Sequence, residues 1–477
     1  MAAADQWRRF ACAGAIVLGA VSSARFVAAQ AEPAGRRLQT EAVARVAAAE
    51  ACEVSDVTHE SLPAVRMTNR WVELILVPKL GGRLMQVKFA GHAYLFENPA
   101  LKGKYFPPMA PEAKSRWYNY GGDKIWPMPE GTEDAQHWPG PIADALDDGD
   151  YKVTLVSHAP RCIVRMDGPA DERTGLQYSR EIALGNDSPE ISFHAVMKNA
   201  SPHPIEWSMQ SVTQYDTANA RADGDYNHEF WAFTPANPKS SYLDGFHVRS
   251  GLADDPSFAV SGGLFRLHWL YLQNEVWIDS PGDWVAVVDH TSGFAMVERF
   301  RYQPDADYPG KASVIFYKNG PAVEMNDRGR PEIRISPDDA PFYMEAELNS
   351  PMAKLAPDQS YAMDTKWNPA RAGKEFAGVA ESGVIVEPLQ AVRTATGMQL
   401  SGSFGVFFQG RVIAHFLGTQ GAELGSLSLG TAEPAEIFNL TQEVAAPPGT
   451  LHVKISIVGE QGENRGVLGE AAVRGNS

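Results

Sequence analysis

The chain has 477 residues, and 44% of them are hydrophobic, which is enough for a large core spread over about two or three domains. The 58 acidic residues outnumber the 42 basic ones, which gives a formal net charge of −16 at pH 7. This balance argues against nucleic acids and anionic membranes as partners, because both bind to basic surfaces. No apolar run after the N-terminus approaches the roughly 20 residues that a membrane-spanning helix needs. We therefore expect no membrane span.

The first 31 residues contain the parts of a secretory signal peptide in their usual order. Arg8 and Arg9 supply the positive charge, residues 10–21 form an apolar stretch, and Ala29-Gln30-Ala31 offers small residues for cleavage. We expect cleavage near Ala31 and a secreted or periplasmic protein.

Two cysteines, Cys52 and Cys162, follow that segment. In an oxidising compartment they could form a disulfide, but two buried, unpaired cysteines fit the sequence equally well. The sequence contains no CxxC, HExxH or EF-hand pattern. Its motifs therefore indicate no metal site and no cofactor.

Hydrophobic patterning divides the rest of the chain into three parts. Residues 32–62 are expected to form a helical or linker segment, with one short helix at 38–51. Residues 63–372 form many short runs that alternate apolar and polar residues between Gly, Pro, Asn and Asp, which predicts an all-β fold: a large antiparallel β-sandwich. Residues 373–477 have fewer aromatic residues and more Gly and Val, and we expect a smaller accessory β-sandwich there. No fixed-period repeat is present, which disfavours a propeller.

The most unusual stretch covers residues 117–129 and reads WYNYGGDKIWPMP. Adjacent glycines are unfavourable in a core strand, and a cluster of aromatic side chains needs something to cover it. We therefore predict a loop that lines a ligand cleft, although a structural loop anchored by tryptophan explains the composition equally well. A sugar would suit such a surface, because indole rings stack on its C–H faces and polar side chains bind its hydroxyls.

Four residues of this stretch are candidate substrate-binding groups. Asn119, Asp123 and Lys124 would supply polar contacts, and Trp126 would supply the stacking surface. The alternative for Asp123 and Lys124 is a simple ion pair with each other, which contributes little stability in an exposed loop.

Three places give residues 65–371 a resemblance to the galactose mutarotase-like superfamily, and more narrowly to an uncharacterised branch of secreted bacterial proteins in it. They are LGGRL at 80–84, the stretch 119–126, and FYMEAELNSP at 342–351 followed by LAPDQSY at 355–361 and Trp367. The resemblance implies a large sandwich of antiparallel sheets that binds a sugar on a concave face.

The resemblance also implies catalytic residues. In mutarotases a Glu near the end of the domain removes the proton of the anomeric hydroxyl, and a His on a middle strand protonates the ring oxygen. The Glu corresponds best to Glu345, with Glu347 as the competing assignment. The His has no counterpart, because Gln210 stands in its place and glutamine cannot exchange a proton near neutral pH.

Glu345 and Glu347 are two residues apart on an expected strand, so both should point to one face with Cα atoms about 6.7 Å apart. Two carboxylates that close raise the pKa of one of them, which acid–base catalysis can use. The alternative is an edge strand on which both face solvent.

Arg83 follows the Gly81-Gly82 pair, and it could hold a carboxylate of a uronic acid through a bidentate contact, as could Lys124 with its single charge. A structural role for Arg83 on a neighbouring carbonyl is equally compatible with the sequence.

Three functions remain open from the sequence. The first is a secreted carbohydrate-binding protein, with or without aldose epimerase activity. The second is a glycoside hydrolase or polysaccharide lyase that acts on uronic-acid-containing glycans. The third is a non-catalytic surface or adhesion protein, in which Glu345 and Lys124 would lie on separate faces.

Overall fold

The computed structural model describes residues 52–108, 117–131, 136–142, 144–325, 328, 331–334 and 342–475. The expected signal peptide (1–31) and the expected helix at 38–51 lie outside these residues. The described residues belong to one compact unit that begins at Ala49. Within them, no helix has the length and apolar character to cross a membrane.

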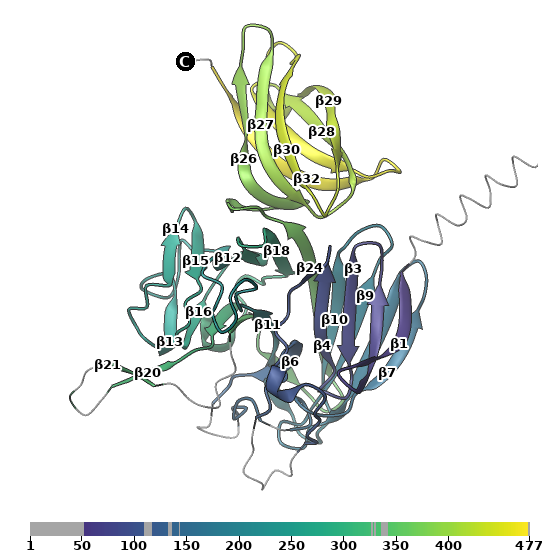
Figure 1. Cartoon of the computed structure of the whole chain (residues 1–477), viewed down its shortest axis with the longest axis vertical. Helices are drawn as coiled ribbons and strands as arrows, with labels where there is room; N and C mark the ends of the chain where they lie inside the picture. The colour runs from purple at the N-terminus through teal and green to yellow at the C-terminus, as the bar shows by residue number, and fades with distance from the viewer. Residues whose placement is uncertain are drawn as a thin grey trace, which may run out of the picture. The chain divides into compact units, whose positions relative to one another are not determined.

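The larger part of the described chain is built on two antiparallel sheets, which confirms the predicted all-β sandwich (Figure 1). In the first sheet the strand order is β1-β2-β3-β4-β6-β11-β22-β19-β16-β13, with β5 beside β4 and β23 beside β11. Its strands are β1 (Glu53–His59), β2 (Leu62–Thr68), β3 (Val72–Val77), β4 (Arg83–Phe89), β5 (His92–Ala93), β6 (Asp123–Met128), β11 (Ile205–Asp216), β13 (His247–Gly251), β16 (Asn274–Ile278), β19 (Val314–Lys318), β22 (Tyr343–Asn349) and β23 (Ala353–Leu355).

In the second sheet the order is β14-β15-β12-β17-β18-β24-β10-β9-β8-β7. Its strands are β7 (Lys152–Ser157), β8 (Cys162–Ala170), β9 (Leu176–Leu184), β10 (Ile191–Asn199), β12 (Phe230–Pro235), β14 (Phe258–Ser261), β15 (Leu264–His268), β17 (Trp284–Asp289), β18 (Phe294–Phe300) and β24 (Ser360–Arg371). Strict alternation of buried and half-buried residues along β9 shows why such sequences form strands with one face in the core.

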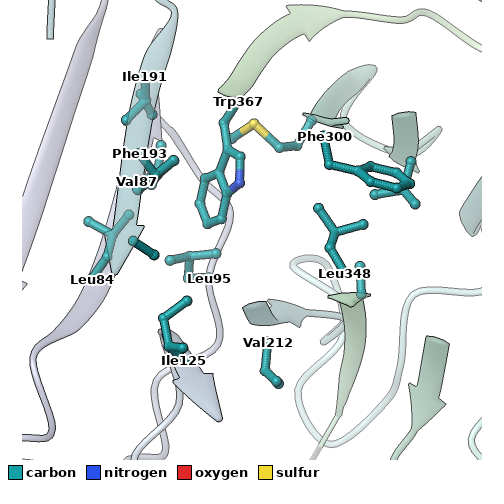
Figure 2. Packing of buried hydrophobic residues seen from close by; sticks show 14 of the residues in the cluster. Leu84, Val87, Leu95, Ile125, Ile191, Phe193, Val212, Phe300, Leu348 and Trp367 are labelled. Carbon is teal, nitrogen blue, oxygen red and sulfur yellow. The ribbon is translucent and has the colours of Figure 1, made fainter. Parts of the chain in front are cut away.

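The core lies between these two sheets. Figure 2 shows the Trp367 indole of β24 among side chains from both layers, including Leu84 of β4, Phe193 of β10 and Leu348 of β22. The Cys52–Cys162 disulfide joins the start of the first sheet to β8 of the second. Of the two alternatives left open by the sequence, the structure has the paired one.

The C-terminal residues form a separate eight-stranded sheet around its own core. The strand order is β29-β28-β31-β32-β26-β27-β30, with β25 beside β26, and the strands are β25 (Gly378–Ala380), β26 (Gly383–Arg393), β27 (Met398–Val406), β28 (Gly410–Leu417), β29 (Glu423–Ala432), β30 (Ile437–Val444), β31 (His452–Val458) and β32 (Asn464–Arg474). The two end strands approach each other, since Gln442 of β30 donates a hydrogen bond to the carbonyl of Leu429 on β29 (3.0 Å).

Short elements complete the described structure. They are the hairpin β20 (Ala322–Met325) and β21 (Pro331–Arg334) and the 3₁₀ turns η1 (Pro99–Leu101), η2 (Pro309–Lys311) and η3 (Thr419–Gly421).

Two local expectations were wrong. Residues 53–59 form β1, although they fall in the segment expected to be helix or linker. Residues 123–128 form β6, although we expected a loop. Pro127 is tolerated there because β6 pairs fully with β11 but meets β4 only at Leu84–Asp123, so no backbone donor is required on that side.

Candidate functional site

A cavity of about 350 Å³ lies against the first sheet, within the usual range of ligand pockets. Residues from six of its strands and from the segments before and after β6 line it. Its aromatic walls are Trp117, Trp126, Trp277, Tyr317 and Tyr343. Four carboxylates also line it, and they are Glu130, Glu275, Glu345 and Glu347.

Strand register places two of these carboxylates side by side. On β22, Glu345 is paired with Gln214 of β11, and Glu347 is paired with Val212. Because side chains alternate along a strand, both glutamates face the cavity, while Leu348 enters the core of Figure 2. The alternative of an exposed edge strand does not apply, since β22 lies between β11 and β19.

Glu345 accepts contacts from two donors. The Lys124 Nζ atom lies 3.4 Å from its Oε1 atom, and the Gln214 Nε2 atom donates to the same oxygen at 2.5 Å. Lys124 also lies over the Trp126 ring, 4.4 Å from the centroid. Its side chain is only 1% exposed, and burial lowers the Lys124 pKa while the Glu345 charge opposes that shift.

Glu347 has a different environment. Its Oε2 atom accepts a hydrogen bond from Gln210 Nε2 at 2.6 Å, the single hydrogen bond that the Glu347 side chain makes with the described residues. Burial raises the Glu347 pKa well above its usual range, and the charges of Glu345, Glu275 and Glu130 raise it further. Two adjacent carboxylates therefore differ: Glu345 faces a cation, and Glu347 favours its protonated form.

The other two carboxylates lie toward β16. The Glu275 carboxylate accepts a hydrogen bond from the Trp277 indole on the same strand, and burial raises its pKa. Glu130 follows β6 and keeps solvent exposure. Desolvation by the surrounding protein raises the Glu130 pKa, and the charges of Glu275 and Glu345 raise it further. Because Glu130 is exposed to water, these effects are weaker than at a buried site.

Asp147 holds the aromatic wall in position. Its carboxylate accepts hydrogen bonds from the indoles of Trp126 (2.7 Å) and Trp117 (3.1 Å), and it forms an ion pair with Arg83 (2.9 Å). Both charged side chains are fully buried. The orientation of the two tryptophans thus depends on a single buried carboxylate.

The structure brings together half of the eight residues predicted from the sequence. Trp126, Gln210, Glu345 and Glu347 line the cavity. Lys124 lies behind the wall and reaches Glu345, so it is bound by a protein carboxylate rather than open to a ligand.

The other three lie elsewhere. Arg83 reaches the site only through Asp147. Asp123 faces the interior between the sheets, where it pairs with Arg180 of β9, because it is one residue away from Lys124 on the same strand. Asn119 is buried and accepts a hydrogen bond from the Gly121 amide at 3.2 Å, outside the lining.

The sequence reasoning missed Glu130, Glu275 and Asp147. Glu130 and Asp147 both follow the aromatic stretch closely, and the acidic run at 147–150 was a usable signal. Glu275 had no local signal, since only the order of the strands brings it near. No group of three or more His, Cys, Asp or Glu among the described residues is arranged to hold a metal ion.

No protein-family model and no curated protein matches the sequence. Among solved structures, a TPR-domain containing protein from Parabacteroides distasonis is 13% identical, with a TM-score of 0.42, and the match covers 65% of this chain but 47% of that protein. A galactose mutarotase-like protein from Clostridium acetobutylicum is 11% identical, with a TM-score of 0.40, over 68% of this chain and 99% of that one. Another from Lactobacillus casei is 11% identical, with a TM-score of 0.40, over 64% of this chain and 99% of that one. The chain is thus similar to solved galactose mutarotase-like proteins across about two thirds of its length.

Proposed function

We propose that this protein binds a sugar in the cavity and interconverts its anomers, as an aldose 1-epimerase does. The observation that carries the proposal is the pair of unlike carboxylates on β22. Glu345 is bound by Lys124 and Gln214, and Glu347 has a raised pKa beside Gln210. A base and an acid on neighbouring positions are the two groups that this reaction needs.

The walls of the cavity support a sugar as the ligand. Indole and phenol rings offer apolar faces for sugar C–H groups, and carboxylate and amide groups accept and donate hydrogen bonds to hydroxyls. Trp126 and Trp117 are held by Asp147, so this surface is formed without the ligand. A preformed wall reduces the cost of ordering side chains on binding.

The chemical step balances with these two groups. Glu345 accepts the proton of the anomeric hydroxyl while Glu347 gives its proton to the ring oxygen. The bond between the anomeric carbon and the ring oxygen breaks, and the anomeric carbon becomes an aldehyde. After rotation about the adjacent carbon–carbon bond, the ring closes on the other face and both protons return.

The same geometry weakens the hydrolase alternative. The two oxygens of the epimerase reaction are attached to one carbon, so two neighbouring carboxylates can serve both. A glycosidase instead needs carboxylates on opposite sides of the bond, about 5–5.5 Å or 6.5–9.5 Å apart. The adhesion alternative expected Glu345 and Lys124 on separate faces, but they are 3.4 Å apart.

Nuclear magnetic resonance of sugar anomers tests the proposal. The full chain should accelerate exchange between the anomer signals of an aldose, and both Glu345→Gln and Glu347→Gln should slow exchange by about 100-fold or more. Glu206→Gln is the matched control, because Glu206 lies on β11 outside the cavity and pairs with Lys354. Sugar binding without faster exchange would replace the epimerase with a recognition protein.

We also propose that the protein works in an oxidising compartment, the periplasm or the exterior. The Cys52–Cys162 disulfide supports this location, because such bonds persist mainly outside the cytosol. Mass spectrometry of the protein from its native host tests it. A cleaved N-terminus at residue 32 and an intact disulfide are expected, and an uncleaved, reduced chain would contradict it.

A further inference from the structure

The cavity has an uneven charge distribution. Its described lining contains four carboxylates and one basic side chain, Arg249, which is exposed and lies 5.8 Å from the centroid of the Trp277 ring. The two buried cations nearby are already bound, Lys124 by Glu345 and Arg83 by Asp147. An anionic sugar would therefore meet acids and no free buried cation.

Two carboxylates have unused bonding capacity toward the cavity. Glu347 is more than nine-tenths buried, and its Oε1 atom has no hydrogen-bond partner among the described residues. Glu130 makes no hydrogen bond or ion pair with the described residues. Glu130 can therefore accept a hydrogen bond from a ligand, while the Glu347 carboxyl keeps the proton that the proposed reaction uses.

Glu275 lies on the side of the cavity opposite the proposed reaction centre. It pairs with Tyr317 of β19, which in turn pairs with Glu345 of β22. Two strand spacings separate Glu275 and Glu345, about 10 Å between Cα atoms. In the arrangement inferred here, the sugar ring would lie between these carboxylates, with its anomeric end toward β22.

We infer that the sugar bound here carries a protonated amine, which Glu275 and Glu130 receive while Glu345 and Glu347 face the anomeric carbon. The inference rests on the proposed function only for the location of the sugar. A cationic amine donates hydrogen bonds to these carboxylates and offsets the excess of negative charge among the described lining residues. An uncharged sugar would leave that excess in place, and a uronic acid would add to it.

The inference has a proton-linked signature. Burial and the charge of Glu345 raise the pKa of Glu275. Desolvation by the nearby protein and the charges of Glu275 and Glu345 raise the pKa of Glu130, and the charge of Arg249 opposes both shifts. A bound ammonium favours the charged carboxylates and so lowers both values. At a pH well below the pKa of the amine, where the amine is already protonated, binding of an amino sugar should therefore release protons to the buffer, whereas binding of an uncharged sugar should not.

Isothermal titration of the full chain with four probes tests this inference. Glucosamine should bind at least about tenfold more tightly than glucose or N-acetylglucosamine, and glucuronate should bind most weakly. The glucosamine heat should differ between phosphate and HEPES buffers, which reports the released protons. Glu275→Gln should reduce the preference for glucosamine over N-acetylglucosamine, and Glu206→Gln should not.

The outcomes separate the two proposals. Equal affinities for glucosamine and glucose, or an unchanged preference in Glu275→Gln, would overturn the amine site. A clear amine preference without faster anomer exchange would leave the amine site standing and refute the epimerase. Faster exchange of glucose anomers without an amine preference would support the epimerase and refute the amine site.

Discussion

Gln210 donates its side-chain amide to Glu347 across the β11–β22 ladder, with 2.6 Å between Nε2 and Oε2. This contact joins Gln210, at the position where the resemblance led us to expect a histidine, to a carboxyl group whose pKa is raised by burial. In the proposed mechanism, the proton donor has moved from one strand to its neighbour.

The first prediction concerns the pH dependence of anomer exchange. Glu347 must carry a proton to act as the acid, so exchange should fall as pH rises through its raised pKa. Replacing Gln210 with Met removes a donor that favours the charged form of Glu347, which raises the Glu347 pKa further. The falling limb of the pH–rate profile should therefore move to higher pH. Exchange rates measured by nuclear magnetic resonance over a pH series give this limb. A limb that stays in place in Gln210→Met would exclude Glu347 as the titrating acid.

The second prediction concerns Asp147. Asp147→Asn leaves the buried guanidinium of Arg83 without its counter-charge, and breaking such a pair costs about 3–5 kcal/mol. The variant should also bind sugar more weakly, because Trp126 and Trp117 lose their common acceptor. Urea unfolding and sugar titration measure the two effects.

Asp364→Asn is the control for Asp147, since Asp364 pairs with His194 at the surface and its side chain is 79% exposed. An exposed pair contributes at most about 1 kcal/mol. Equal losses in the two variants would show that the buried network has no special role.

The third prediction concerns Glu298, which lies in the core and accepts a hydrogen bond from the Tyr215 hydroxyl at 2.5 Å. Burial raises its pKa to about 8, far above the value of about 4.3 expected in the unfolded chain. Between these two pH values, Glu298 carries a proton in the folded state but not in the unfolded state. The free energy of unfolding should therefore fall by about 1.4 kcal/mol for each unit by which the pH rises, as the contribution of this group.

Glu298→Gln should remove that contribution, because an amide keeps the shape without titrating. Chemical unfolding of the wild type and the variant between pH 5 and pH 8 tests it. Curves with the same pH slope would mean that Glu298 titrates alike in both states.

The fourth prediction concerns the disulfide between Cys52 and Cys162, which are 110 residues apart in the sequence. Its removal in Cys162→Ser should destabilise the fold by about 2–5 kcal/mol, since a long loop is no longer closed in the unfolded state. Unfolding curves with and without a reductant should coincide for the variant and differ for the wild type. A wild type that is insensitive to reductant would contradict the structural role of this bond.

Much of the fold was readable from two-residue periodicity. Strands such as β9 and β10 alternate strictly, and most of the predicted strands are present. The failures have physical causes. β1 has charged and polar residues at positions that are only half buried, so its sequence has no apolar face to detect. β6 is buried along its whole length, and its Gly and Pro neighbours imitate a loop.

The site was readable only where residues share a strand. Glu345 and Glu347 follow from the period of β22, and Gln210 follows from the resemblance. Asp123 lies on the opposite face from Lys124, because a shift of one residue along a strand changes the face. Glu275 depends on β16 lying beside β19, and strand order of this kind leaves no trace in the local sequence.

Gly81 adopts a positive φ of 65°, and a Cβ atom placed on it would lie 2.0 Å from the Asp147 carbonyl oxygen. Even an alanine there would displace the backbone of Asp147, whose side-chain carboxylate holds both tryptophans in position. In a saturation mutagenesis screen scored by ligand capture, position 81 should therefore be as intolerant as a pocket residue. Library designs that vary only the lining of the cavity would overlook it.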